Sequence, residues 1–109
     1  MKTESLAELL ARLRASGEAY LEFLRVESMS AGLHLLPAGG TDEQSPHAED
    51  EVYVVLGGRS LFTAGAQTRE VQPTDTIFVP AGEEHRFHDI SEELRLIVVF
   101  APAEGSRAG

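Results

Sequence analysis

Short apolar runs separated by turn-forming residues occupy this chain from residue 19 to residue 100. Runs of this kind are typical of β-strands, and the Gly and Pro residues between them favour turns, as at Gly57-Gly58 and Pro80-Ala-Gly82. No helical segment of useful length lies between the runs, so the pattern predicts an all-β sandwich or barrel. The predicted strands are 19–26, 28–36, 51–56, 60–63, 68–71, 76–79, 85–87 and 94–100.

The segment before these strands has the pattern of a short helix. Its leucines at 6, 9, 10 and 13 recur on one helical face. Ser5 with Glu8 forms a capping-box pattern, and Gly17 is a natural stop. The leucine stripe must be buried, and we expect it to pack on the body of the domain, with a dimer contact as the second interpretation.

Length and charge limit the kind of protein. The chain has 109 residues, no cysteine and a formal charge of −9, which suits one domain and disfavours nucleic acid and anionic membrane partners. The amino terminus lacks the order of a secretory signal and no apolar run is long enough to span a bilayer, so we expect a cytoplasmic protein. We divide the chain into a helix at 1–17, a β-barrel at 18–102 and a flexible tail at 103–109.

The densest group of metal-type donors lies between residues 40 and 58. His47 and Glu51 are four residues apart, just before an apolar strand. On a straight strand their Cα atoms would be about 13 Å apart, too far to share one ion, so a metal site requires a bend between them. From this stretch alone, a metal-binding loop and an exposed acidic loop remain open alternatives.

A second donor follows the Pro80-Ala-Gly82 turn. His85 opens the next short strand, and if that strand packs near Glu51, His85 completes a set of two imidazoles and one carboxylate with His47. By strand alternation His88 lies on the other face, where we expect an exposed or edge histidine. His34 sits in an apolar strand and is expected to be a core or interface histidine, with a pocket wall as the alternative.

These two segments resemble the paired motifs of the cupin superfamily, G(X)5HXH(X)3–4E(X)6G and G(X)5PXG(X)2H(X)3N. His47, Glu51 and Gly58 match the first motif, and Pro80-Ala-Gly82 with His85 matches the second. Three positions depart from it: Ser45 stands where the first histidine is expected, with Gln44 beside it, Thr74 replaces the opening glycine of the second motif, and Asp89 replaces the closing asparagine.

The resemblance implies a single-domain double-stranded β-helix, a jelly-roll barrel, with the short helix before it. It also implies one divalent transition metal held by His47, Glu51 and His85, with Gln44 as a further oxygen donor. Fe, Mn, Ni and Zn are not distinguished by these donors. Such a site polarises a bound carbonyl or enolate or activates water, the steps shared by cupin dioxygenases, isomerases, cyclases and decarboxylases.

The expected function is that of a metal-binding cupin that acts on or binds a small organic molecule in the barrel. Whether the protein is an enzyme is left open. The alternatives are a non-enzymatic ligand-binding or sensing cupin with a weak or absent metal site, and an interaction scaffold. Its assembly is expected to be a homodimer. The residues expected to wall the pocket are Tyr53, Val55, Phe78, Phe87, Ile97 and Val99. Tyr53 shares parity with Glu51, which would turn its hydroxyl to the pocket, but the favoured interpretation is a core aromatic with its hydroxyl at the rim.

Overall fold

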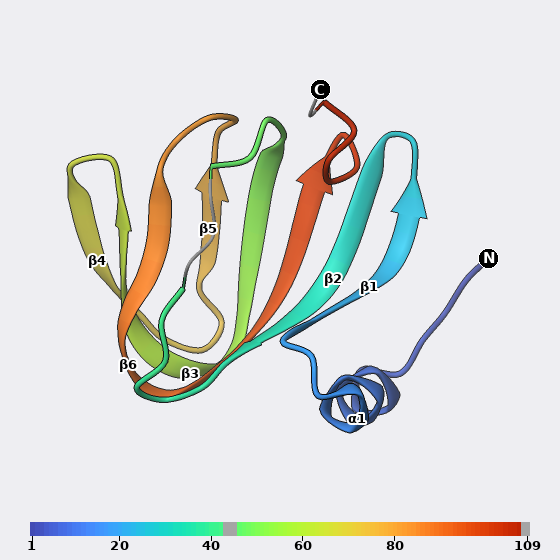
Figure 1. Cartoon of the computed structure of the whole chain (residues 1–109), viewed down its shortest axis with the longest axis horizontal. Coiled ribbons are helices and arrows are strands. Elements are labelled where there is room, and N and C mark those ends of the chain that lie inside the picture. The colour runs from blue at the N-terminus through green and yellow to red at the C-terminus, as the bar shows by residue number, and fades with distance from the viewer. Residues whose placement is uncertain (43–45, 108–109) are drawn as a thin grey trace.

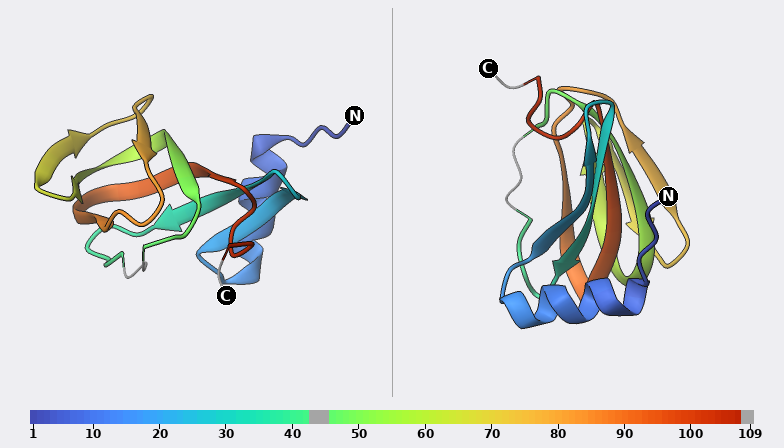
Figure 2. Two further views of the ribbon diagram at one scale, coloured as in Figure 1. Left: turned by 90° about the horizontal axis from the view of Figure 1, so that it is seen from above. Right: turned by 90° about the vertical axis from the view of Figure 1, so that its right-hand side faces the viewer.

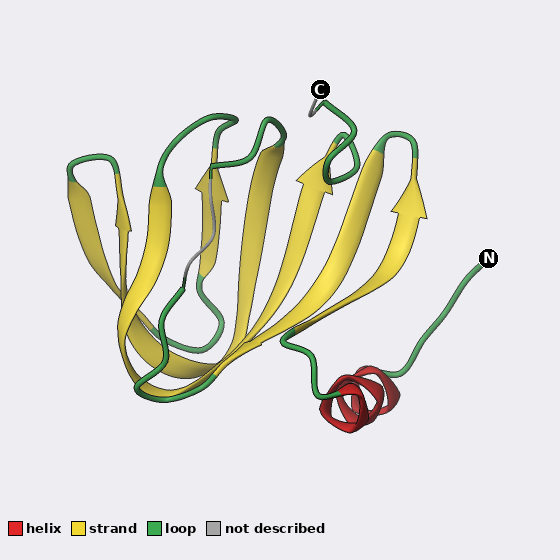
Figure 3. Ribbon diagram, in the orientation of Figure 1, coloured by secondary structure: helices red, strands yellow, loops and turns green. Residues whose placement is uncertain are grey.

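A computed structural model describes residues 1–42 and 46–107 of the chain. In this part, helix α1 (Leu6–Ser16) precedes six strands: β1 (Tyr20–Val26), β2 (Met29–Leu36), β3 (Asp50–Ala64), β4 (Gln67–Val71), β5 (Thr76–Val79) and β6 (His85–Ala101). The strands form one antiparallel sheet in the order β1-β2-β6-β3-β4, and β5 pairs with the first part of β3 (Figure 1, Figure 3). The predicted class, mostly β with one short N-terminal helix, is confirmed.

Helix α1 begins and ends where the sequence predicts. The Ser5 side chain accepts a hydrogen bond from the Glu8 amide at 3.3 Å, and Gly17 closes the helix in the left-handed conformation with φ 75°. No helix among the described residues is long and apolar enough to cross a membrane.

The apolar stripe of α1 packs on the outer face of the sheet. Leu9 and Leu13 are buried against Leu33 and Leu35 of β2, and the helix lies outside the curve of the sheet (Figure 2). Core packing, the first of the two uses expected for the stripe, is therefore the one the structure shows. Leu6 at its beginning stays 45% exposed.

Strands β3 and β6 are longer than the sequence predicts. The expected turn at Gly57-Gly58 is wrong: β3 continues through it, and the pairing of β3 with β6 instead shifts register between Val55 and Leu61. Gly58 has φ 98°, and Asp89 on β6 has φ 49°. Such irregularities bend a strand and sharpen its twist, so the paired strands curl together.

The same irregularities change which residues point inward. On β3 the buried positions are odd-numbered before the glycines (Glu51, Tyr53, Val55) and even-numbered after them (Ser60, Phe62). On β6, His85 and Phe87 are buried before Asp89, and the buried residues after it are the even-numbered Ile90, Leu94, Leu96, Val98 and Phe100, with Glu92 exposed. Because both strands change parity, one continuous inner face is kept through the bend.

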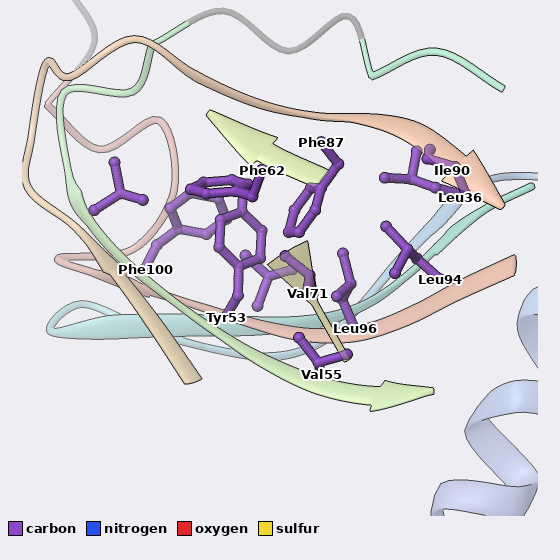
Figure 4. Packing of buried hydrophobic residues seen from close by; sticks show 12 residues of the cluster. Leu36, Tyr53, Val55, Phe62, Val71, Phe87, Ile90, Leu94, Leu96 and Phe100 are labelled. Atoms are coloured by element: carbon purple, nitrogen blue, oxygen red, sulfur yellow. The ribbon is translucent and has the colours of Figure 1, made fainter. Parts of the chain in front are cut away.

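The curled sheet encloses one apolar core. Aromatic rings from distant parts of the chain meet in it, with the Phe62 and Phe87 centroids 4.6 Å apart and those of Tyr53 and Phe87 5.0 Å apart (Figure 4). The buried members of this cluster are Leu36, Tyr53, Val55, Phe62, Val71, Val79, Phe87, Ile90, Leu94, Leu96, Val98 and Phe100.

Three of the expected pocket-wall residues do not face this interior. Phe78 is 62% exposed on β5. Ile97 packs toward the helix side, and Val99 is only half-buried, because the residues of β6 that point inward here are Val98 and Phe100. The expectation for Phe78, Ile97 and Val99 was wrong, because the alternation within separate short strands does not show which residues point inward. Tyr53, Val55 and Phe87 do lie in the core.

The residues that follow β6 are bonded to the rest of the fold. Ala103 is 2% exposed, and the Glu49 carboxylate accepts hydrogen bonds from the amides of Gly105 and Arg107 at 3.0 and 3.1 Å. Residues 103–107, expected to belong to a flexible tail, thus make contacts with the body of the fold, and residues 108–109 lie outside the described part.

Replacing Gly58 by alanine should lower the stability of the fold. Gly58 has φ 98°, and a Cβ placed there would clash with the backbone of Glu93 and Leu94. We expect a loss of about 2–4 kcal/mol in the free energy of unfolding, measured by urea denaturation. Gly39→Ala is the matched control, because Gly39 has φ 74° with nothing within 4 Å of an added Cβ, and it should lose only about 1 kcal/mol. Equal losses in both variants would contradict the role given to close packing at the bend.

Replacing Thr74 by glycine should have the opposite effect. Thr74 has φ 77°, a left-handed conformation that is strained for a β-branched residue. Relief of this strain should exceed the entropy that glycine adds to the unfolded chain, for a net gain of about 0.5–1 kcal/mol in the same denaturation assay. The exposed strand residue Thr76 provides the control, since Thr76→Gly should destabilise the protein.

Candidate metal centre

The bend brings together two side chains that lie at opposite ends of the β3–β6 pair. In the register of the sheet, Glu51 pairs with Phe100 and His85 pairs with Ala64. A straight strand from residue 51 to residue 64 would span about 43 Å. In the curled sheet the His85 Nε2 and Glu51 Oε1 atoms are 2.9 Å apart.

His85 is held in a defined orientation. Its Nδ1 atom donates a hydrogen bond to the Glu83 carbonyl oxygen at 2.8 Å. Its Nε2 atom lies 3.1 Å from the Tyr53 hydroxyl and faces Glu51. Because a backbone carbonyl can only accept, the proton belongs on Nδ1 and Nε2 is the nitrogen that can bind a cation.

Two opposing effects act on the pKa of His85. Burial lowers it, whereas the contact with Glu51, the hydrogen bond to the Glu83 carbonyl and the charges of Glu51 and Asp42 raise it. The raising effects prevail, so the pKa of His85 lies above its ordinary value. The surroundings of His85 therefore favour a positive charge at this point.

Glu51 is a buried carboxylate with one close polar neighbour, His85. Its side chain is 1% exposed, its Oε1 atom lies 2.9 Å from His85 Nε2, and its Oε2 atom has no hydrogen-bond partner within the described part of the chain. Two ligands bound at about 2.1 Å and at right angles are about 3.0 Å apart, close to the 2.9 Å between Glu51 Oε1 and His85 Nε2. Glu51 and His85 thus fit two adjacent ligands of one divalent ion.

His47 lies on the loop that precedes β3. The Gly82 amide donates to the His47 carbonyl at 2.7 Å, and the Ala81 amide donates to Asp50 Oδ1 at 2.9 Å. These bonds tie the loop before Glu51 to the turn before His85. The bend between His47 and Glu51 that a metal site requires is present, since β3 begins only at Asp50.

The His47 ring lies near the His85 ring and beside Phe100. Its centroid is 6.4 Å from that of His85 and 4.7 Å from that of Phe100. Two imidazoles bound to one ion at about 2.1 Å have centroids roughly 4.6–6.5 Å apart, so this spacing is at the wide end of the range. Across residues 1–42 and 46–107 no three donors are close enough together to hold an ion.

The remaining candidate positions are placed differently. Gln44 and Ser45 lie outside the described residues. His88 points away from the pair, with Nε2 2.7 Å from Thr63 Oγ1 and Nδ1 2.7 Å from Asp89 Oδ2. Tyr53 is fully buried with its hydroxyl on His85, so it belongs to the site itself and not to its rim.

Two pockets open at the candidate ligands, one at His47 and one at His85. One, of about 330 Å³, is lined by Tyr20, His34, Pro46, His47, Val98, Phe100 and Glu104. The other, of about 240 Å³, is lined by Pro46, Thr63, Gly65, Glu84, His85 and Arg86. His34, for which a pocket wall was the alternative interpretation, lies in the first pocket with its ring edge-on to Tyr20 at 5.8 Å.

Three buried or half-buried carboxylates of this region were not singled out from the sequence. Asp42 accepts a hydrogen bond from the Phe87 amide at 3.0 Å, Glu49 holds the C-terminal turn, and Glu104 lies 3.9 Å from His47. Asp42 and Glu49 flank His47 in the sequence, so the density of acidic residues there was the available signal. Glu104 lies in the predicted tail, where no sequence pattern indicated a functional residue.

Comparisons with known proteins agree with this architecture. A protein of Streptomyces coelicolor, the uncharacterized protein SCO3923, is 52% identical over 104 residues, covering 95% of this chain and 99% of its own. The crystal structure of TT1209 from Thermus thermophilus superposes with a TM-score of 0.78 at 28% identity, over 94% of this chain and 99% of that one.

A more distant relative has a named activity. The Mycobacterium tuberculosis protein Rv1717, named beta-D-galactosidase, is 31% identical over 75 residues, covering 69% of this chain and 65% of its own. The family model for the cupin domain matches residues 32–100, a span that contains both donor segments and the bend between them. The chain belongs to the cupin family, and its fold is the cupin double-stranded β-helix.

Proposed function

We propose that this protein is a metal-binding cupin that holds one divalent transition metal through Glu51, His85 and His47 and takes a small organic molecule in the adjoining pocket. The observation that carries the proposal is the buried Glu51 carboxylate, whose Oε1 atom faces His85 Nε2 at 2.9 Å and whose Oε2 atom has no hydrogen-bond partner within the described residues. Gln44 is a further candidate donor from its place in the sequence.

The physical argument is one of unmet charge. A buried carboxylate without hydrogen bonds costs several kcal/mol, and folded proteins compensate such groups with a partner or a cation. One histidine faces Glu51, and its Nε2 atom is also the nitrogen oriented to bind a metal. A divalent ion between Glu51 and His85 would satisfy both groups at once.

The residues around the pair have separable tasks. Glu83, through its carbonyl, and Tyr53, through its hydroxyl, hold the His85 ring in position. A bound metal would polarise an oxygen atom of the ligand or lower the pKa of a bound water, chemistry suited to an isomerase-like or dioxygenase-like enzyme. Fe, Mn, Ni and Zn all accept this donor set.

The 330 Å³ pocket beside His47 suits a small molecule with hydroxyl groups. Val98, Phe100 and Pro46 give it an apolar wall, and the buried Tyr20 hydroxyl has no hydrogen-bond partner within the described residues. Glu104 adds an acceptor. The name of the Mycobacterium tuberculosis relative, a galactosidase, points to a hydroxyl-rich molecule and supports this ligand class.

A second function is favoured by a specific observation. The described residues contain no group of three donors close enough to hold an ion, and the His47 ring is 6.4 Å from His85. A non-enzymatic cupin that binds or senses a small ligand, with weak metal affinity, would have this arrangement. The two functions differ in how tightly the protein holds a metal.

Metal analysis of untagged protein purified without added metal tests the first proposal. We expect close to one divalent metal per chain, lost in His85→Ala and Glu51→Gln and at least tenfold more weakly bound in His47→Ala, because each removes a donor. His88→Ala is the control, since His88 bonds Thr63 and Asp89 and should leave the metal content unchanged. A metal-free protein whose thermal stability does not change on adding Fe, Mn, Ni or Zn would instead support the sensing function.

The pH dependence of stability should report the neutral state of His34. Burial lowers the pKa of His34, an effect that the nearby charges of Asp42 and Glu51 oppose without overcoming. Since the unfolded chain has a histidine pKa of about 6.5, the unfolded state takes up the proton first as the pH falls, so stability is present above this pH and is lost on acidification. Urea denaturation of the metal-free protein between pH 8 and 5 should show a smaller loss in His34→Gln than in the wild type. Parallel curves for the two proteins would contradict this.

A further inference from the structure

A chain of side-chain hydrogen bonds on the outer face of the sheet lies outside the candidate metal centre. We propose that Thr63 is a nucleophile that accepts an acyl group from a small carboxylic ester, with His88 as its general base and Asp89 as the residue that positions His88. This acyl-transfer site is a further activity of the fold, and it does not depend on a bound metal.

The three side chains come from two adjacent strands. Thr63 on β3 pairs with Arg86 on β6, and His88 stands two residues further along β6, opposite Leu61. Side chains at such diagonal positions of an antiparallel pair share one face and are within reach of each other. His88 Nε2 is 2.7 Å from Thr63 Oγ1, and His88 Nδ1 is 2.7 Å from Asp89 Oδ2. One histidine thus joins a hydroxyl to a carboxylate.

The direction of every bond in this chain follows from Asp89. An ionised carboxylate only accepts hydrogen bonds, so His88 Nδ1 carries a proton and donates it to Asp89. In the neutral imidazole Nε2 then has a lone pair, to which Thr63 Oγ1 donates. Thr63 Oγ1 is also 2.8 Å from Thr68 Oγ1, which therefore donates to Thr63. The Thr63 proton is directed at a base, as in a hydroxyl activated for nucleophilic attack.

Contact between His88 and Asp89 requires an irregular backbone. Successive side chains of a regular strand point to opposite faces of the sheet. Asp89 has φ 49°, in the left-handed region, and this turn of the backbone brings its carboxylate to the ring of the preceding residue. Backbone conformations of this kind cluster at functional sites, where the surrounding fold maintains them. The bend of β6 therefore also orients His88.

The exposure of the two residues indicates how they differ in function. The His88 side chain is 19% exposed, so the fold covers most of the ring, whereas the Asp89 side chain is 72% exposed. Interactions between charges open to water are weak. Asp89 therefore acts mainly by fixing the tautomer and the orientation of the His88 ring, and only His88 exchanges a proton with Thr63.

A small pocket opens at Thr63. Thr63 and Arg86 both line the cavity of about 240 Å³, a volume that suits a small acyl group. The Arg86 guanidinium is a cation in the same wall, suited to the oxygen that becomes negative when a carbonyl is attacked. Glu84 lines the pocket too, so the wall carries both charges and favours a neutral ester.

The proposed step is balanced within these groups. Thr63 Oγ1 bonds to the carbonyl carbon of the ester while its proton moves to His88 Nε2, and the bond between that carbon and the alcohol oxygen breaks. His88 then gives the proton to the leaving oxygen. The products are an acylated Thr63 and a free alcohol, and His88 returns to its neutral state.

Reaction of the full chain with p-nitrophenyl acetate, in the presence of a metal chelator, tests the site. We expect release of p-nitrophenol and an acetyl ester on Thr63, located by peptide mass spectrometry. Thr76, exposed on β5, is the internal control and should not be acetylated, because exposure alone does not activate a hydroxyl. Acetylation of Lys2 and of the amino terminus gives amides, which peptide mapping assigns separately.

Substitutions separate the tasks of the residues. Thr63→Ala should abolish the ester at this position, whereas Thr63→Ser should keep it, since serine offers the same hydroxyl with less crowding. His88→Gln should slow acetylation of Thr63 about 100-fold, because the general base is lost. Thr68→Val removes only the bond from Thr68 to Thr63 and should not slow the reaction. Urea denaturation checks that each variant is folded.

Asp89→Asn tests positioning while keeping the backbone, because asparagine also adopts positive φ readily. The asparagine amide can donate to His88 Nδ1 and so favour the opposite tautomer. ¹⁵N NMR should show His88 protonated on Nδ1 in the wild type and a mixture of tautomers in the variant, with acetylation at least about tenfold slower. A variant with the wild-type tautomer and rate would overturn the role of Asp89.

Two results would overturn the proposal as a whole. One is acetylation of Thr63 that is no faster than that of Thr76, and the other is an unchanged rate at Thr63 in His88→Gln. In either case the hydrogen bonds of His88 only tie the strands together. Neither result bears on the metal centre, because the chelator keeps metal out of the reaction.

Discussion

The bend that β3 and β6 make together, at Gly58 on one strand and Asp89 on the other, is the constraint on which the site depends. It turns two long paired strands into a curled sheet and returns the His85 end of the pair to the Glu51 end. The left-handed backbone of Gly58 tolerates no Cβ, because the backbone of Glu93 and Leu94 passes directly beside it. The backbone requirement for glycine at position 58 therefore affects whether Glu51 and His85 come together.

The buried and loop carboxylates of this structure fall into two groups. Asp42, Glu49 and Asp50 each accept hydrogen bonds from backbone amides, and these bonds hold the loop and turns around the pocket. Glu51 is the exception, since its Oε1 atom faces His85 Nε2 and its buried Oε2 atom has no hydrogen-bond partner in the described part of the chain. A buried, incompletely satisfied carboxylate of this kind is typical of functional residues.

The positions at which this chain departs from the cupin motifs have a physical meaning in the fold. Thr74 and Asp89 replace the motif's glycine and asparagine, and they are the two residues other than glycine with positive φ among those described. Glycine and asparagine are the residues that adopt this conformation most readily, and aspartate tolerates it better than threonine. These two motif positions therefore reflect a backbone requirement and not metal binding. The fold keeps the positive φ at both positions although Thr74 and Asp89 replace glycine and asparagine.

The sequence by itself determined the strand-rich class and the capped helix and predicted that Glu51 and His85 lie together, because these features depend on local periodicity, turn residues and motif spacing. It misplaced Phe78, Ile97 and Val99 and missed the continuity of β3 and β6, since inward parity changes at Gly58 and Asp89 and alternation alone cannot show where. Only the tertiary structure placed Tyr53 on His85, Glu49 on the Gly105 amide and Glu104 in the pocket wall. Those contacts join residues more than thirty positions apart, and they follow from the curl of the sheet and not from any pattern along the chain.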